Sequence, residues 1–156
     1  MRFQIEALPQ DTFQSLFALD GQALAAAGAA RVRIAEPHAA PCRISLVDAP
    51  PGETLILAPF VHQSALSPYR ASGPIFVRQG VARAALEPGD VPDALRRRVL
   101  SLRAYDAHAE IIDADVVDGR ELEPLIARLF ARAGADYLHA HFAKRGCYAA
   151  KIVRAS

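Results

Sequence analysis

The feature that most constrains the fold is an alternation of apolar and polar residues on both sides of a short polar turn. The segments LSLRAYD and EIIDADVV lie within residues 99–117, and the turn between them falls at Asp106 to Ala109. Successive side chains of a β-strand point to opposite faces, so a period of two predicts strands with one apolar face. We therefore expect an antiparallel hairpin here.

A helix is expected directly after this hairpin, from Arg120 to Ala133. Asp118 and Glu121 have the spacing of a capping box, in which side chains satisfy backbone N–H groups at a helix start. Pro124 lies in the first turn, where its missing N–H costs little, and Gly134 suits the position after the last turn. The apolar stripe of this helix consists of Leu122, Leu125, Ile126, Leu129 and Phe130.

Shorter segments predict the remaining strands, and DTFQSLFALDG predicts a short N-terminal helix. The strands are expected at residues 2–8, 31–35, 42–47, 53–60 and 75–78, and in a last hairpin over residues 136–152. We expect the strands over 42–47 and 53–60 to pair with each other in antiparallel orientation.

These elements predict an α+β fold in a single domain over residues 1–156. We expect a mostly antiparallel sheet of six to eight strands, with one main helix in the C-terminal half and a short N-terminal helix packed on it. The connection from Val117 through the main helix to Tyr137 resembles a crossover, which would give the last hairpin a parallel neighbour.

Composition argues against several classes of protein. A formal net charge of +1 does not suit an electrostatic nucleic-acid binder. No segment approaches the ~20 apolar residues of a membrane span. The N-terminal segment MRFQIEALPQD lacks the apolar core of a secretory signal, so Cys42 and Cys147 are expected to be reduced thiols in a cytoplasm.

The basic residues are nearly all arginine, since only Lys144 and Lys151 are lysine. A GC-rich bacterial genome explains this composition, and so does recognition of anions, because a guanidinium binds carboxylate and phosphate through two hydrogen bonds. The expected partners are therefore an anionic small molecule and, through an exposed sheet edge, a second copy of the chain.

The last hairpin, DYLHAHFAKRGCYAAKI, carries the residues with the most chemical capability. A three-residue turn from Lys144 to Gly146, with a left-handed glycine, would place His141 opposite Ala149. In that register His139, His141 and Cys147 share one face, and Tyr148 points into the core from the other.

Three interpretations of this shared face stay open. The first is structural: both histidines are partly exposed sheet residues, and Cys147 contributes packing. The second is a divalent transition metal held by His139 and His141 with Cys147 or Asp115. The third is catalysis by Cys147 as nucleophile, with His141 or His139 as base and Arg145 lowering the thiol pKa.

Asp115 also has a structural interpretation that it shares with Asp113, two positions earlier on the same strand. Both carboxylates are expected to form an ion pair with Arg103 of the facing strand.

The long connection over residues 61–74 supplies a second group of candidates. Tyr69, Arg70, Ser72 and Gly73 are candidate ligand-binding residues together with Arg145, because backbone N–H groups and a guanidinium bind anions. An ordered surface loop is the alternative. The chain contains no P-loop, no G-x-S-x-G elbow, no C-x-x-C and no H-E-x-x-H.

Four segments resemble a known family: CRISLVDAPPGET, SPYRASGPIFVR, LSLRAYDAHAEIIDADVVDG and YLHAHFAKRGCYAAKI. Together they are similar to the bacterial family called domain of unknown function 1203, over roughly Arg31 to Arg154. The resemblance implies a small, stand-alone bacterial protein. It carries no established activity, cofactor or catalytic residue to any position of this chain.

Two classes of function follow from the residues. One is a ligand-binding or enzymatic pocket for an anionic small molecule, lined by His139, His141, Cys147 and the loop from Tyr69 to Gly73. The other is a non-catalytic module that binds a small molecule or a protein, in which the histidines and the cysteine are structural.

Overall fold

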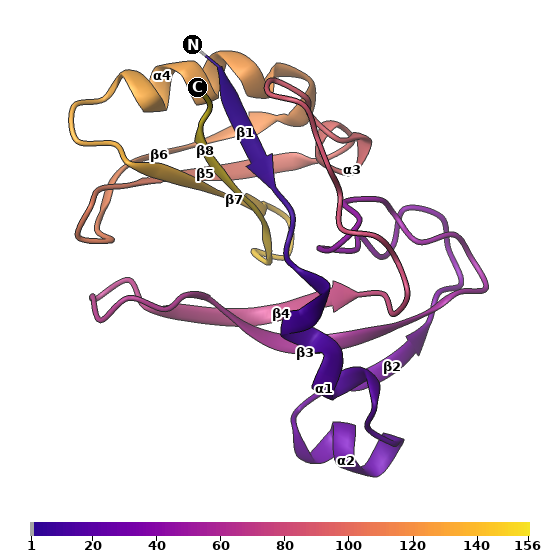
Figure 1. Ribbon diagram of the computed structural model, residues 1–156. Helices are drawn as coiled ribbons and strands as arrows, with labels where there is room; N and C mark the ends of the chain where they lie inside the picture. Colours follow the sequence, from indigo (N-terminus) through magenta and orange to yellow (C-terminus); the bar gives the residue numbers. More distant parts are fainter. Residues whose placement is uncertain (1) are drawn as a thin grey trace. The chain divides into compact units, whose positions relative to one another are not determined.

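The computed structural model describes residues 2–156 and shows eight strands with a few short helices and one longer helix (Figure 1). The predicted α+β class is confirmed, but the strands form two antiparallel sheets where one was expected. By their contacts the described residues divide into two compact units. The prediction of a single domain over residues 1–156 stays a prediction.

The first unit contains the described residues up to Glu6, then Val61–Gly73 and Leu86–Ser156. Its centre is a five-stranded sheet in which every neighbouring pair is antiparallel. The strand order across the sheet is β1 (Phe3–Glu6), β8 (Tyr148–Arg154), β7 (Tyr137–Phe142), β5 (Val99–Tyr105) and β6 (Ile111–Asp118).

The predicted hairpin over residues 99–117 is confirmed as β5 and β6. Asp106 closes its turn, because one carboxylate oxygen accepts hydrogen bonds from the backbone N–H groups of His108 and Glu110. Ala109 follows in the left-handed region at φ 61°. Local side-chain chemistry therefore fixes the turn where the sequence placed it.

The main helix consists of a 3₁₀ turn, Gly119–Glu121, followed by α4, Leu122–Ala131. Asp118 caps it by accepting a hydrogen bond from the Arg120 N–H at 3.0 Å. All five residues of the apolar stripe are buried. A Cβ at Gly119 would lie 2.0 Å from the Leu95 carbonyl oxygen, so only glycine fits at this start.

Helix α4 lies across one face of the five-stranded sheet and contacts β5, β6 and β7 (Figure 1). It connects β6 to β7, so the expected crossover is present. The expected parallel neighbour of the last hairpin is wrong, because β5 lies between β6 and β7 and is antiparallel to both.

A short helix, α3 (Asp93–Arg96), completes the first unit and begins after Pro92. Its Ala94 and Leu95 are buried. Pro92 suits this place because the first positions of a helix leave their backbone N–H groups unpaired in any case.

The second unit contains Ala7–Phe60 and Pro74–Ala85. A 3₁₀ turn, Gln10–Phe13, leads into the short helices α1 (Gln14–Phe17) and α2 (Gly21–Ala26). The unit includes most of a three-stranded sheet in the order β2 (Ala30–Arg33), β3 (Thr54–Gln63) and β4 (Ala71–Val77).

The strand expected over residues 42–47 is wrong. This segment folds into a turn, in which the Leu46 N–H donates to the Cys42 carbonyl and Leu46 adopts a φ of 55°. The expected pairing of this segment with the strand over residues 53–60 is also wrong, since β3 pairs with β2. Strands β3 and β4 extend into the expected loop over 61–74 and shorten it to residues 64–70.

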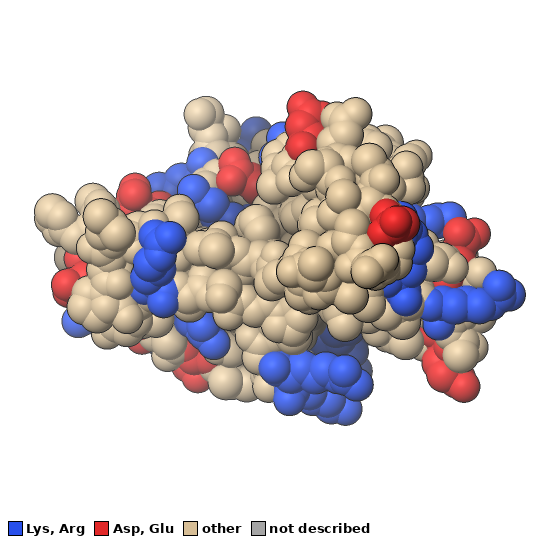
Figure 2. Space-filling view, turned by 90° about the horizontal axis from the view of Figure 1, so that it is seen from below, with Lys and Arg blue, Asp and Glu red and all other residues tan. Residues whose placement is uncertain are grey.

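Basic and acidic side chains are mixed on the molecular face drawn in Figure 2, where they form small groups among uncharged residues. Among the residues that the structure describes, no helix has the length and apolar character needed to cross a membrane.

Candidate metal centre

Three histidines of the first unit converge on one point. His62 lies near the end of β3, and His139 and His141 lie on β7. One ring nitrogen from each residue lies within 4.8 Å of the other two. Among the described residues, no cysteine, aspartate or glutamate joins this group, which we call the histidine cluster.

The two histidines of β7 share a face because of the period of a strand. Their neighbours in sequence, Leu138 and Ala140, point to the opposite face, which packs against α4. His139 is 4% exposed and His141 is fully buried. The interpretation of both histidines as partly exposed sheet residues is therefore wrong.

A β-bulge adds Tyr148 to this face. The predicted register holds between Ala140 and Ala150 but shifts at His141, which lies opposite Tyr148 and not opposite Ala149. The Tyr148 ring consequently stacks on His62, with centroids 5.6 Å apart and planes at 8°. The expectation that Tyr148 points away from the histidines is wrong, because a bulge puts two successive residues opposite one.

A backbone contact fixes the tautomer of His141. Its Nδ1 lies 3.0 Å from the carbonyl oxygen of Gly146, which is left-handed at φ 79° as the turn predicts. A carbonyl only accepts, so Nδ1 carries the proton of the neutral ring and Nε2 carries the lone pair. The turn therefore determines which nitrogen of His141 can bind a metal.

The other two histidines each bury a polar nitrogen. The Nδ1 atoms of His62 and His139 are buried and have no hydrogen-bond partner among residues 2–156. A buried polar atom without a partner costs stability, so native proteins keep few of them. Both unpartnered atoms belong to rings of the histidine cluster, which marks the cluster as a candidate ligand site.

Burial and nearby positive charge keep these rings neutral. Burial lowers the pKa of His139 to about 3, and the charges of His141, His62, Lys151 and Arg103 act in the same direction. Burial and Arg103 also lower the pKa of His62. Neutral imidazole is the form that binds metal ions.

Tyrosines enclose the histidine cluster along the same strands. Tyr105 and Tyr137 stack with ring centroids 5.1 Å apart, and the Gln63 side-chain amide donates to the Tyr137 hydroxyl at 2.8 Å. Burial raises the pKa of Tyr105, while a hydrogen bond and the charge of Arg103 oppose that shift. The rings of Tyr105 and Tyr137 lie 4.9 and 5.3 Å from the His139 ring, so the cluster lies in an aromatic environment.

Two basic side chains flank His139 on the same face. In the sheet register Arg103 of β5 and Lys151 of β8 lie directly opposite His139 on its two sides. Both are half-buried. The Lys151 ammonium lies 4.7 Å from the centre of the Tyr137 ring. Within residues 2–156, no carboxylate forms an ion pair with either side chain.

Cys147 lies outside the histidine cluster, although the sequence placed it beside His141. It is half-buried, and its sulfur lies 3.9 Å from the carbonyl oxygen of Arg145. Arg145 itself is exposed in the turn. The bulge puts Tyr148 opposite His141, in the position that the predicted register gave to Ala149.

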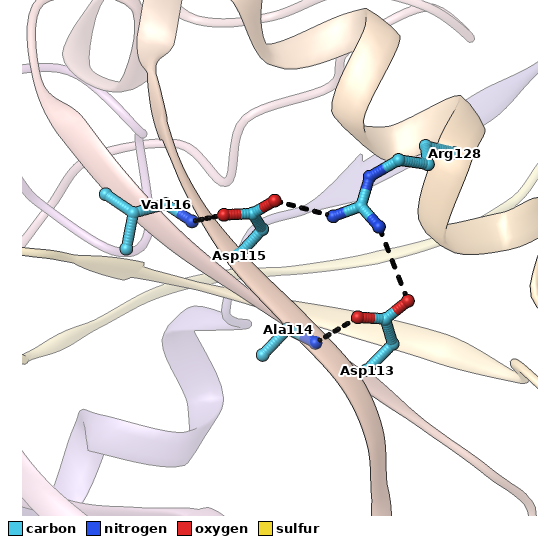
Figure 3. A network of polar contacts seen from close by, with 5 residues as sticks. All are labelled: Asp113, Ala114, Asp115, Val116 and Arg128. Atoms are coloured by element: carbon cyan, nitrogen blue, oxygen red, sulfur yellow. Dashed lines mark hydrogen bonds and ion pairs between the residues drawn. The ribbon is translucent and has the colours of Figure 1, made fainter.

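Asp115 lies on the opposite face of the sheet from His139. Its partner in the register is Leu102, whereas the partner of His139 is Arg103. Figure 3 shows Asp113 and Asp115 both reaching Arg128 of α4, at 3.4 and 2.8 Å. The predicted ion pair with Arg103 is wrong, because period two puts Arg103 on the other face.

Only part of the segment from Tyr69 to Gly73 is a loop: Tyr69 and Arg70 lie in a surface turn, whereas Ser72 and Gly73 lie in the first part of β4. Tyr69 is 40% exposed, and its backbone N–H donates to the hydroxyl of Ser67. The Arg70 guanidinium bonds to the carbonyl of Ser64, and Ser72 is exposed. The role of Tyr69, Arg70, Ser72 and Gly73 in binding an anion stays a prediction.

His62 is the site residue that sequence reasoning missed. The expected strand ended at Phe60, which left His62 in a loop, whereas β3 continues to Gln63. The β-branched Val61 is the local signal for a longer strand, but nothing in the sequence spacing links His62 to the last hairpin.

The sequence model of one protein family matches residues 39–154, a range that includes all three members of the histidine cluster and both flanking cations. The description of this family is "Protein of unknown function (DUF1203)". No curated protein and no solved structure matches the chain. The match covers most of the sequence, and the chain therefore belongs to the DUF1203 family.

Proposed function

We propose that this protein binds a divalent transition-metal ion through His62, His139 and His141. The observation that carries the proposal is the convergence of their ring nitrogens within 4.8 Å. In a tetrahedral centre with metal–nitrogen bonds of ~2.0–2.1 Å, two ligand nitrogens lie roughly 3.3 Å apart. Small side-chain movements would therefore close the cluster on an ion.

The surroundings of the three rings support this assignment. The two orphaned Nδ1 atoms of His62 and His139 would gain a partner in the ion. The contact between His141 Nδ1 and the Gly146 carbonyl oxygen is the outer-shell hydrogen bond that orients metal-binding histidines in general. His62 takes the place for which the sequence offered Cys147 or Asp115.

The ligand set also limits the kind of metal site. Three imidazoles without thiolate or carboxylate suit zinc, copper, nickel or iron better than magnesium or calcium. Structural zinc sites use four protein ligands, whereas sites that bind substrate keep one position open. A centre made of the histidine cluster alone has three protein ligands, so it is of the second kind. Enzymes and ligand-binding proteins use such centres.

A non-catalytic interaction module is the second candidate. The stacking of His62 on Tyr148 and of Tyr105 on Tyr137 favours it, because an aromatic core also explains buried rings. It leaves the buried Nδ1 atoms of His62 and His139 unexplained, so we prefer the metal centre.

Metal titration of the tag-free protein tests the proposal. Chelator-treated protein is titrated with Zn²⁺ and Co²⁺ by calorimetry, and bound metal is measured by elemental analysis. We expect one ion per chain. His139→Gln should weaken binding by more than the ~10–100-fold that loss of an outer-shell partner causes.

His108→Gln is the matched control, because His108 is exposed in the turn between β5 and β6. It should bind metal as the wild type does. Circular dichroism verifies that each variant folds. If His139→Gln does not fold, His62→Gln serves as a second ligand variant. Substoichiometric binding by the wild type, or unchanged binding by folded ligand variants, would contradict the proposal.

A further inference from the structure

We propose that the metal centre takes a small oxyanion, a carboxylate or a phosphate, as its fourth ligand, and that Arg103 and Lys151 hold this anion. The inference rests on the proposed function, because the anion binds to the ion held by the histidine cluster. It deepens that function by naming the class of ligand and two further residues that bind it.

The charge balance of the face is the first argument. Three neutral imidazoles do not offset a divalent ion, and the two flanking cations add positive charge beside it. Asp113 and Asp115 lie on the other face and pair with Arg128. An anion is therefore the ligand that the face lacks.

Glu6 is the acidic residue that shares this face with Lys151. It lies opposite Lys151 in the register between β1 and β8. No ion pair joins the two side chains within the described part of the chain. The Lys151 ammonium lies instead over the Tyr137 ring, which neighbours the ring of His139.

The position of the cations is the second argument. Arg103 and Lys151 flank His139 from the two neighbouring strands, where directly opposed Cβ atoms lie ~4.5–5.5 Å apart. An oxyanion with one oxygen on the metal has further oxygens for outside donors. A guanidinium binds two such oxygens with its parallel N–H groups, and an ammonium binds as a point charge.

The burial of the cations is the third argument. Half-buried charges lose hydration, and proteins normally compensate this loss with a paired charge. Lys151 gains part of that compensation from the Tyr137 ring. For Arg103 the structure provides a hydrogen bond with Tyr105, and a bound oxyanion would supply the missing opposite charge.

Cobalt spectroscopy separates the anion from the metal. High-spin Co²⁺ replaces zinc in such sites, and its visible bands change when the fourth ligand changes. Co²⁺-loaded protein is titrated with acetate and, separately, with inorganic phosphate at constant ionic strength. We expect a saturable spectral change with both or with one, and the preferred anion identifies the ligand as a carboxylate or a phosphate.

Two variants test the residues. Arg103→Gln and Lys151→Met should each weaken binding of the preferred anion about tenfold or more. This is the usual effect of losing a charge-assisted hydrogen bond. Arg132→Gln and Lys144→Met make the same changes at exposed positions and should leave anion affinity unchanged. Metal affinity without anion should not fall in any of the four.

Linkage provides an independent measurement. If the anion binds to the metal-loaded protein more tightly than to the metal-free protein, it must tighten metal binding by the same factor. Calorimetric Zn²⁺ titrations with and without the preferred anion should therefore show that factor, and Arg103→Gln should reduce it.

The outcomes distinguish the two proposals. Failure of the wild type to bind Co²⁺ would contradict the proposed function and this inference together. Co²⁺ binding without any response to acetate or phosphate would overturn the inference alone. A response that Arg103→Gln and Lys151→Met leave intact would show that these two residues do not hold the anion.

Discussion

The two faces of the five-stranded sheet differ in what they bury. The face toward α4 buries aliphatic residues such as Leu102 and Leu138, and its charged residues form ion pairs at the partly exposed rim. The other face buries His139 and His141 and places Tyr148, Arg103 and Lys151 around them. Aliphatic burial stabilises, whereas burial of incompletely paired polar groups costs stability.

This difference indicates where function resides. A face that serves stability alone can be filled with aliphatic side chains, as the α4 face is. Buried residues that reduce stability are typical of binding and catalytic sites, because such sites need side chains that function requires and stability does not. The predictions below test the contrast between the faces, from the largest expected effect to the smallest.

Leu138→Ala tests the stabilising face. Leu138 is fully buried, and truncation of such a side chain should lower the free energy of unfolding by about 2–5 kcal/mol. Urea unfolding measures the change. Val116→Ala, at a residue that is 59% exposed on β6, is the control and should change it by less than about 0.5 kcal/mol. Equal effects of the two would remove the basis for calling the α4 face the core.

Zinc should stabilise the protein through the other face. An ion that binds only the folded state at 100 times its Kd adds about 2.7 kcal/mol to the free energy of unfolding. Thermal unfolding with and without Zn²⁺ measures the gain as an increase in Tm. His141→Gln should abolish the increase, and Leu138→Ala should keep it if that variant folds. An increase that survives in His141→Gln would assign the zinc to another place.

The stability of the metal-free protein should depend on pH through His139. The unfolded imidazole takes up a proton near its ordinary pKa of 6.5, while the buried one stays neutral down to about 3. The unfolded state therefore binds more protons in this window, so this contribution is complete above pH 6.5 and is lost as pH falls toward 3.

The slope from this one group is at most about 1.4 kcal/mol per pH unit. Urea unfolding between pH 7 and 4 compares the wild type with His139→Gln, in which the slope should be shallower. Carboxylates titrate in both proteins, so the difference between the two slopes reports His139. Parallel slopes would mean that burial does not hold this ring neutral.

Arg128→Gln should have the smallest effect. Its ion pairs with Asp113 and Asp115 join partly exposed side chains, and such pairs contribute about 0–1 kcal/mol (Figure 3). Urea unfolding at low and high salt measures the change, which should shrink as salt screens the charges. A loss of Zn²⁺ binding in this variant would contradict the separation of the two faces.

Much of the first unit could be predicted from the sequence because its signals are local. The hairpin of β5 and β6 follows from alternation and an aspartate turn, and α4 follows from its stripe and the Asp118 cap. The prediction of a strand over residues 42–47 used the same kind of local signal and was wrong. Its apolar residues suit a strand, but Leu46 enters the left-handed region and the segment closes into a turn.

The sequence by itself determined that His139 and His141 share a face, since a period of two is a local property of any strand. Only the tertiary structure decided what joins them. A bulge of one residue turned Tyr148 toward the histidines, and the path of β3 brought His62 to the same point from a distant part of the chain. Local spacing specifies which side a residue faces, whereas its neighbours across strands depend on register and chain path, which the packing of the whole unit selects.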